Sequence, residues 1–267
     1  MANLKNHGIE DLTQFALDAI HRLGEEALSF YGKGKSQVKF DEGLVTEVDF
    51  QLTKSFQSQL DAHYPEHSIF NGSQERTDDY THDGKRYLWI YDPLDGIANF
   101  QAGIPIWGIS LALHENFWPI LGVFYMPSTG DLFHARAGHQ AFRGKEEIRI
   151  STQEEINDES LLLTYSRFHK HYQSTFPGKI RNLGCTAAHI CYVAMGRAEA
   201  AIIANESYQD LAAAGVIIES AGGKILKMDG SEFYLSDYLD AQKIGEHLLV
   251  VSRDTFSQVR DTLKEIA

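Results

Sequence analysis

The sequence of 267 residues has little cysteine, no long apolar run and an excess of acidic over basic residues. Its two cysteines, Cys185 and Cys191, lie six residues apart without a CxxC pattern, so we expect neither an intrahelical disulfide nor a zinc site. No run approaches the roughly 18 apolar residues of a membrane span, and the N-terminal residues 1–8 contain no apolar signal-peptide core. We therefore expect a cytoplasmic protein with reduced thiols and no membrane partner.

The charge balance argues against a nucleic-acid partner. There are 24 Lys and Arg against 37 Asp and Glu, which gives a net charge of −13, and such a surface repels nucleic acid. An acidic protein that handles an anionic substrate needs metal ions to offset its own field. The hydrophobic share of 43% is that of an ordinary globular protein, so the chain can form one large domain or two compact subdomains.

The segment 89–100 (WIYDPLDGIANF) begins as an apolar strand and ends in two carboxylates. Asp92 and Asp95 lie three residues apart around the stiff Pro93, and Gly96 then allows a close turn. Carboxylate oxygens suit a hard divalent cation, and the N–H groups at a helix start suit an anion. A metal–phosphate site is our leading hypothesis, and a solvated strand-to-turn junction is the alternative.

The first half of the chain predicts helices followed by strands. Apolar residues at helical spacing indicate a helix over 9–31, and a second helix is expected over about 47–63. Thr46 is its candidate N-cap, and helix capping alone would explain Glu47 and Asp49. A short strand is expected at 67–70, and an antiparallel meander should follow with strands at 87–91, 106–114, 118–126, 132–135 and 140–143. We expect residues 1–150 to form an α+β subdomain that carries the segment 89–100.

Beyond a polar boundary at 151–160 the predicted elements alternate. Strands are expected at 161–165, near 180, and at 198–203, 224–227 and 247–251. Helices are expected at 167–175, 186–195 and 209–220, with a closing helix from residue 254. This alternation predicts an α/β subdomain over residues 151–267, and the fold class of the whole chain is α/β.

Six segments, in order along almost the whole chain, resemble the inositol monophosphatase family. Residues 89–100 resemble its W-x-x-DP-[IL]-DG-T-x-N-F signature. The others are 44–49 (V-T-x-x-D), 103–113 (the next strand), 130–133 (G-E-L-F), 182–188 (R-x-x-G-S-A-A) and 209–215 (W-D-x-A-A-G). The resemblance implies a layered αβαβα sandwich of the inositol monophosphatase/fructose bisphosphatase type.

The same resemblance implies an activity and a set of site residues. The protein would be a Mg²⁺-dependent phosphomonoesterase that hydrolyses a small phosphorylated polyol, sugar or nucleotide through a metal-activated water, and it would form a homodimer. Nucleotide phosphatases of the wider superfamily are a narrower option. The implied metal ligands are Asp92, the carbonyl oxygen of Leu94, Asp95 and Asp210. The implied phosphate- and substrate-binding residues are Gly96, Ile97, Gly184, Cys185 and Thr186, and the implied catalytic residues are Asp49, Glu75 and Asp92.

The sequence departs from the family pattern where water activation is expected. Ser73 stands at the position of a Glu that binds metal and takes a proton from water, and Ile97 stands at the position of the signature Thr. Losing a general base costs roughly 10²–10⁴-fold in rate. Glu75 or Glu47 are the candidates to replace it, although Glu75 also fits a solvated loop acid. The alternative function is therefore a degenerate member that binds metal and phosphate with little turnover.

There are two further departures, and the second bears on the substrate. Gln209 replaces the Trp that precedes the last metal aspartate. Ile203 lies about where inositol-specific members place a Glu that binds a substrate hydroxyl. The sequence therefore gives no sign that the substrate is inositol phosphate.

Overall fold

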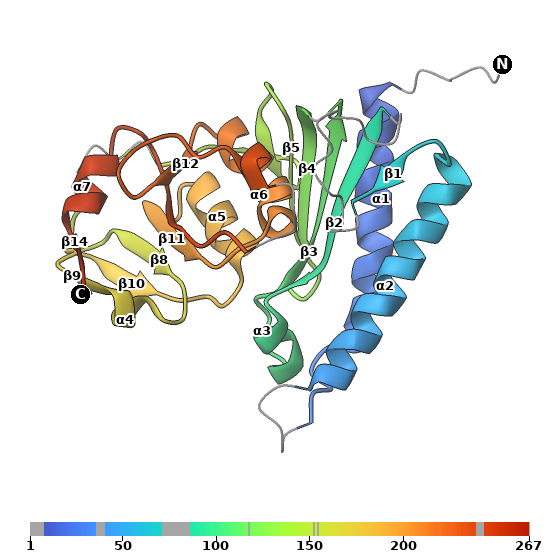
Figure 1. Ribbon diagram of the computed structural model, residues 1–267, viewed down its shortest axis with the longest axis horizontal. Helices are drawn as coiled ribbons and strands as arrows, with labels where there is room; N and C mark the ends of the chain where they lie inside the picture. The colour runs from blue at the N-terminus through green and yellow to red at the C-terminus, as the bar shows by residue number, and fades with distance from the viewer. Residues whose placement is uncertain are drawn as a thin grey trace.

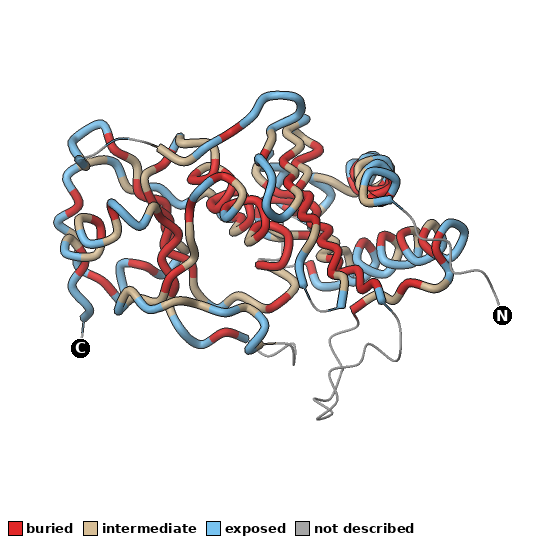
Figure 2. The backbone as a smooth tube through the Cα atoms, turned by 90° about the horizontal axis from the view of Figure 1, so that it is seen from above, coloured by how far each residue is buried: buried red, intermediate tan, exposed pale blue. Residues whose placement is uncertain are grey.

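The computed structural model describes residues 8–35, 41–70, 86–116, 118–151, 153, 155–238 and 243–266. These residues form two large sheets, with helices between the sheets and on their outer faces (Figure 1). The buried residues follow the sheets and the helices that lie between them (Figure 2). The chain is therefore built in five layers, which confirms the predicted αβαβα arrangement.

The first layer consists of α1 (Ile9–Leu28) and α2 (Glu42–His63). The buried side chains of α1 recur at helical spacing and form one apolar stripe against the sheet. The predicted start of the second helix was wrong, because α2 begins five residues earlier. Asp41 is its N-cap and accepts a hydrogen bond from the Leu44 N–H, whereas the Thr46 hydroxyl donates to the Glu42 carbonyl within the helix.

The second layer is a seven-stranded sheet in sequence order. It consists of β1 (Ser68–Ile69), β2 (Tyr87–Asp95), β3 (Gly108–Glu115), β4 (Trp118–Met126), β5 (Asp131–Arg136), β6 (Ala141–Arg143) and β7 (Glu146–Ile148). From β2 to β7 every pair is antiparallel, which confirms the predicted meander, although β7 was not predicted. On β2, Trp89 and Tyr91 pack against α1 and α2, whereas Leu88 and Ile90 pack on the opposite face.

The middle layer is formed by α5 (Thr186–Ala194) and α6 (Tyr208–Ser220), which pack between the two sheets (Figure 1). Both helices are rich in alanine, which allows a close approach to the strands. At Gly122 of β4, an added Cβ would lie only 2.3 Å from the Ala213 carbonyl oxygen of α6. The small residues therefore set how closely the α6 helix, which carries Asp210, lies against the first sheet.

The second sheet has the strand order β10-β8-β11-β13-β12. Its strands are β10 (Lys179–Arg181), β8 (Leu161–Thr164), β11 (Ala200–Ala204), β13 (His247–Val251) and β12 (Lys224–Lys227). β8 runs parallel to both of its neighbours, and β13 is antiparallel to both of its neighbours. All five strands were predicted, and the mixed pairing arises because β13 returns in the opposite direction.

The outer layer on this side differs from the prediction. It contains α4 (Phe168–His171), α7 (Phe256–Asp261), the short 3₁₀ helix η1 (Leu235–Tyr238), and a two-stranded sheet of β9 (Tyr172–Ser174) and β14 (Leu263–Glu265). The helix predicted over 167–175 was too long, because residues 172–174 pair with β14 near the end of the chain. A pairing partner about 90 residues away leaves no local signal in the sequence. No described helix is long and apolar enough to cross a membrane.

Candidate active site

The site begins where β2 leaves the ladder of the first sheet. The pairing of β2 with β3 is regular to Asp92 and resumes only at Asp95, so Pro93 and Leu94 have no partners in β3. This bulge lets the carboxylates of Asp92 and Asp95 both face the space beyond the strand end. The chain then passes through Gly96 into the short helix α3 (Ile97–Ala102).

Gly96 is required at this turn for two reasons. Its φ of +84° lies in the left-handed region, which other residues rarely adopt. An added Cβ would also lie 3.0 Å from the Ile106 carbonyl oxygen and 3.1 Å from the Cys185 Cβ. Residue 96 therefore has no room for a side chain, because the backbone at Ile106 and the Cys185 side chain already occupy that space.

The surroundings of Asp92 disfavour the charged form of its carboxylate. Its Oδ1 accepts a hydrogen bond from the Leu94 N–H at 3.2 Å, and its Oδ2 accepts none from a described residue. Burial raises the pKa of Asp92 well above its ordinary value, and the charges of Asp210 and Asp95 raise it further. The charged form is therefore unfavourable unless a cation is nearby.

Asp95 connects β2 to the beginning of α5. Its Oδ1 accepts from the Thr186 N–H at 3.2 Å, and its Oδ2 accepts from the Ala187 N–H at 2.6 Å and from the Cys185 thiol at 3.3 Å. Burial raises the pKa of Asp95, and these hydrogen bonds to the charged form offset part of the increase. The predicted residues Cys185 and Thr186 are thus brought directly to a predicted metal ligand.

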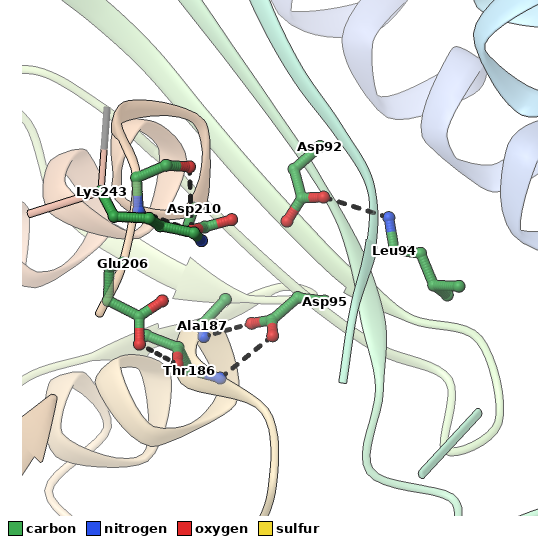
Figure 3. A network of polar contacts seen from close by, with 9 residues as sticks. Asp92, Leu94, Asp95, Thr186, Ala187, Glu206, Asp210 and Lys243 are labelled. Carbon is green, nitrogen blue, oxygen red and sulfur yellow. Dashed lines mark hydrogen bonds and ion pairs between the residues drawn. The ribbon is translucent and has the colours of Figure 1, made fainter. Parts of the chain in front are cut away.

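Asp210 faces this pair from α6 (Figure 3). Its Oδ2 accepts from the Ser207 N–H at 2.6 Å and from the Ser207 hydroxyl at 2.9 Å, and it forms an ion pair with Lys243 at 3.4 Å. Its Oδ1 accepts no hydrogen bond from a described residue. One oxygen of Asp210 therefore caps α6, and the other remains available as a ligand.

The three aspartates offer oxygen donors of the kind that Mg²⁺ binds. Among the described residues, no three His, Cys, Asp or Glu side chains already lie close enough to enclose a metal ion. The fit instead rests on the donor chemistry: half-buried carboxylates of like charge, with two oxygens that no described residue satisfies. Such a group is costly without a cation, so the residues fit a divalent metal that draws them together.

The remaining predicted residues are less directly placed. Asp49 lies on the exposed side of α2 and accepts from the Thr53 hydroxyl at 3.1 Å, although its charge contributes to the raised pKa of Asp92. Ile97 opens α3, and its side chain packs against the apolar core below α1 and α2. Ser73 and Glu75 lie outside the described residues.

Asn99 holds the two halves of the site together. Its Nδ2 donates to the Ile106 carbonyl at 2.6 Å and to the Leu183 carbonyl at 2.7 Å. Gly184 has a φ of +76°, and an added Cβ there would lie 2.9 Å from the Asn99 Nδ2. Asn99 belongs to the signature stretch, but the sequence does not reveal that it reaches a loop more than 80 residues away.

Glu206 was missed by the sequence analysis. Its Oε1 accepts from the Thr186 hydroxyl at 2.8 Å, and Thr186 also bonds to Asp95 through its N–H (Figure 3). Burial raises the pKa of Glu206 to about 8, and the charges of Asp95 and Asp210 contribute. The available signal was a carboxylate four residues before Asp210, in the connection between β11 and α6.

An open cavity of about 680 Å³ adjoins these residues. The predicted substrate-binding residues Gly184, Cys185 and Thr186 form part of its wall, together with Glu206. The rest of the wall is largely polar, so the cavity suits a polar molecule.

Comparison with known proteins identifies the family. The model of the inositol monophosphatase family matches residues 9–249. The chain belongs to the inositol monophosphatase family. This confirms the family indicated by the sequence motifs and, with it, the enzyme class of phosphoric monoester hydrolase.

Relatives and a solved structure agree with this assignment. The chain is 32% identical over 250 residues to inositol monophosphatase 1 of Solanum lycopersicum, covering 86% of this chain and 89% of that protein. It is 30% identical over 220 residues to a histidinol-phosphatase of Chlorobaculum parvum, covering 79% and 83%. The structure of an IMPase from Thermotoga maritima superposes with a TM-score of 0.76 at 25% identity, covering 94% of this chain and 96% of that one. These proteins are named as phosphatases, so they lend no support to the degenerate alternative.

Proposed function

We propose that this member of the inositol monophosphatase family hydrolyses a phosphomonoester of a small polyol, sugar or nucleotide with Mg²⁺ as cofactor. The observation that carries the proposal is the pair of enclosed carboxylates, Asp92 and Asp95, that face Asp210. Burial raises the pKa of both groups, and their hydrogen bonds offset this only in part, which supports a cation at this place. A divalent cation supplies that compensation and also attracts a phosphate to an acidic protein.

In this proposal Asp92, Asp95, Asp210 and the Leu94 carbonyl oxygen hold the metal. Bound Mg²⁺ would polarise the phosphate and offset charge on the leaving group. The N–H groups of Gly96 and Ile97 orient the phosphate at the open turn.

The α5 loop positions the site from the other side. The N–H groups of Thr186 and Ala187 fix the carboxylate of Asp95. Asp49 and Glu75 are the proposed groups that orient and deprotonate the attacking water, since Ser73 and Ile97 lack the carboxylate and hydroxyl of the family pattern.

Three parts of the sequence-based prediction remain proposals: the division into subdomains, the oligomeric state and the location in the cell. We propose that residues 1–150, with Asp92 and Asp95, and residues 151–267, with Asp210, form two subdomains that share the site. We also propose that the protein forms a homodimer and acts in the cytoplasm on a small phosphorylated metabolite.

Steady-state phosphate release from a panel of phosphomonoesters tests the proposed function. The wild-type protein should release phosphate with Mg²⁺ and lose this activity in a chelator. The Asp92→Asn variant should lose at least 100-fold, because removal of an electrostatic contact at a reaction centre costs about 10²–10³-fold. Phosphate release that is unchanged by this substitution would refute the proposal.

The degenerate alternative rests on Ser73 and Ile97 and has its own test. If the chain lacks a working base, the double variant Ser73→Glu with Ile97→Thr should increase the rate many-fold. If Glu75 or another group already serves, the double variant should give no gain. A large gain over a barely active wild type would favour the alternative.

A further inference from the structure

The cavity beside α5 is the space available to the leaving group. Cys185 and Thr186 line it, and both also bond to Asp95 on their inner side. Thr186 contacts Asp95 with its N–H and Glu206 with its hydroxyl, so a single residue separates the two carboxylates. A group held by Glu206 would therefore lie close to the phosphoester.

Glu206 is held in place by both its backbone and its side chain. The preceding residue, Asn205, has a φ of +66°, which is uncommon for a residue other than glycine. The Glu206 carbonyl accepts from the Ile244 N–H at 2.7 Å, and the side chain accepts from the Thr186 hydroxyl at 2.8 Å.

The carboxylate of Glu206 has no ion pair of its own in the described part of the chain, although the positive charge of Lys243 lowers its pKa and so compensates it in part. Its Oε2 accepts no hydrogen bond and its carboxylate forms no ion pair with a described residue, while Lys243 is paired with Asp210. Arg167 lies on the exposed rim of the cavity and does not pair with Glu206. A phosphate dianion bound nearby adds negative charge, so an enclosed carboxylate at this place favours a cation.

Several other polar groups of the cavity wall already have partners. The Tyr165 hydroxyl bonds to the His171 ring at 2.7 Å, and Asn182 bonds to Ser166 and to the Gly184 N–H. Among these groups Glu206 is the carboxylic acid with an oxygen left to satisfy. It is therefore the group most able to distinguish one leaving group from another.

We propose that Glu206 is a specificity-determining residue that binds a positively charged nitrogen on the leaving group. The preferred substrates are then phosphate esters of amino alcohols, in which the ammonium lies a few bonds from the ester oxygen. A neutral polyol could donate a hydrogen bond to Glu206 but would leave its charge uncompensated. This inference rests on the proposed phosphatase function.

A matched pair of esters tests the proposed role of Glu206. 2-Aminoethyl phosphate and 2-hydroxyethyl phosphate differ only in that an ammonium group in the first is a hydroxyl group in the second. The wild type should have the higher kcat/KM for the amino ester. In Glu206→Gln, which keeps an oxygen for the Thr186 hydroxyl, the preference should fall roughly 10- to 100-fold, the value of a charge-assisted hydrogen bond. The loss should appear mainly as an increased KM for the amino ester.

Glu219→Gln is the matched control, because Glu219 is exposed at the end of α6 and pairs with Lys224. It should leave the preference unchanged. Equal losses for both esters in Glu206→Gln, no change for either, or a larger loss for the hydroxy ester would each overturn the inference.

The two proposals fail separately. If the wild type hydrolyses no ester, the proposed function fails, and ligand binding then decides the role of Glu206. With Mg²⁺ present, 2-aminoethylphosphonate should raise the Tm of the wild type more than 2-hydroxyethylphosphonate does. The same difference in Glu206→Gln, or its absence in the wild type, would contradict the assignment.

Discussion

Gly96 is the residue on which the open turn of the site depends. It combines a left-handed backbone with close contacts to Ile106 and Cys185. Gly130, in the turn between β4 and β5, has a similar φ of +76° but no atom within 4 Å of an added Cβ. A side chain at residue 130 would therefore cost only the unfavourable left-handed conformation, whereas a side chain at residue 96 would also crowd its neighbours.

We expect Gly130→Ala to lower the free energy of unfolding by about 1–2 kcal/mol, the cost of a left-handed residue with a Cβ. Gly96→Ala should lower it further, because Ile106 or Cys185 must also move, and it should abolish Mg²⁺-dependent phosphate release. Chemical denaturation and phosphate assays of both variants check this. Equal stability losses with retained activity in Gly96→Ala would show that the turn tolerates a side chain.

At the scale of single elements, α6 uses Asp210 for two purposes. The capping box with Ser207 begins the helix, and the free carboxylate oxygen points toward Asp92. Substitutions can separate the two, since Ser207 takes part only in the cap.

Ser207→Ala should lower the free energy of unfolding by about 1 kcal/mol through loss of the cap, and it should keep the rise in Tm that Mg²⁺ with phosphate produces. Asp210→Asn keeps a side-chain oxygen for the cap but loses the charge, so it should retain most of its stability in chelator and lose that rise. Thermal unfolding with and without Mg²⁺ measures both effects. A full Mg²⁺ response in Asp210→Asn would exclude this residue as a ligand.

At the scale of the whole molecule, the charged carboxylates of the site lower the stability of the metal-free protein. The pKa of Glu206 rises from 4.5 in the unfolded chain to about 8 in the folded protein. Its contribution to stability is therefore complete below pH 4.5 and is lost as the pH rises to about 8, because the unfolded state releases its proton first.

Glu206→Gln removes this titration. In chelator, the variant should become more stable relative to wild type as the pH rises from 4.5 to about 8, with no further change above that. Denaturation at several pH values gives the comparison, with Glu219→Gln as the control that should follow the wild type. A stability difference independent of pH would show that the surroundings of Glu206 do not raise its pKa.

The sequence predicted the architecture wherever the signal was local. The apolar stripe of α1 and the alternation along β2 gave their elements directly. The order of six motifs indicated the family, and that resemblance implied Asp92, Asp95 and Asp210 as metal ligands. Each helix, strand and motif was recognised from residues close together in the chain.

What the sequence could not predict depends on long-range contacts. Tyr172 leaves the helix after α4 because β14 offers a strand partner. Asn99 binds the carbonyl of Leu183, and Glu206 reaches Thr186 only once β11 and α5 are packed. Neither spacing nor residue type reports such pairings.

Calorimetric titration of Mg²⁺ into the metal-free protein, with and without inorganic phosphate, tests most directly whether Asp92, Asp95 and Asp210 form a metal–phosphate site. The wild type should show saturable binding that phosphate tightens, and Asp92→Asn should lose it while Glu219→Gln keeps it. Mg²⁺ binding that is absent from the wild type, or that is unchanged in Asp92→Asn, would contradict the account.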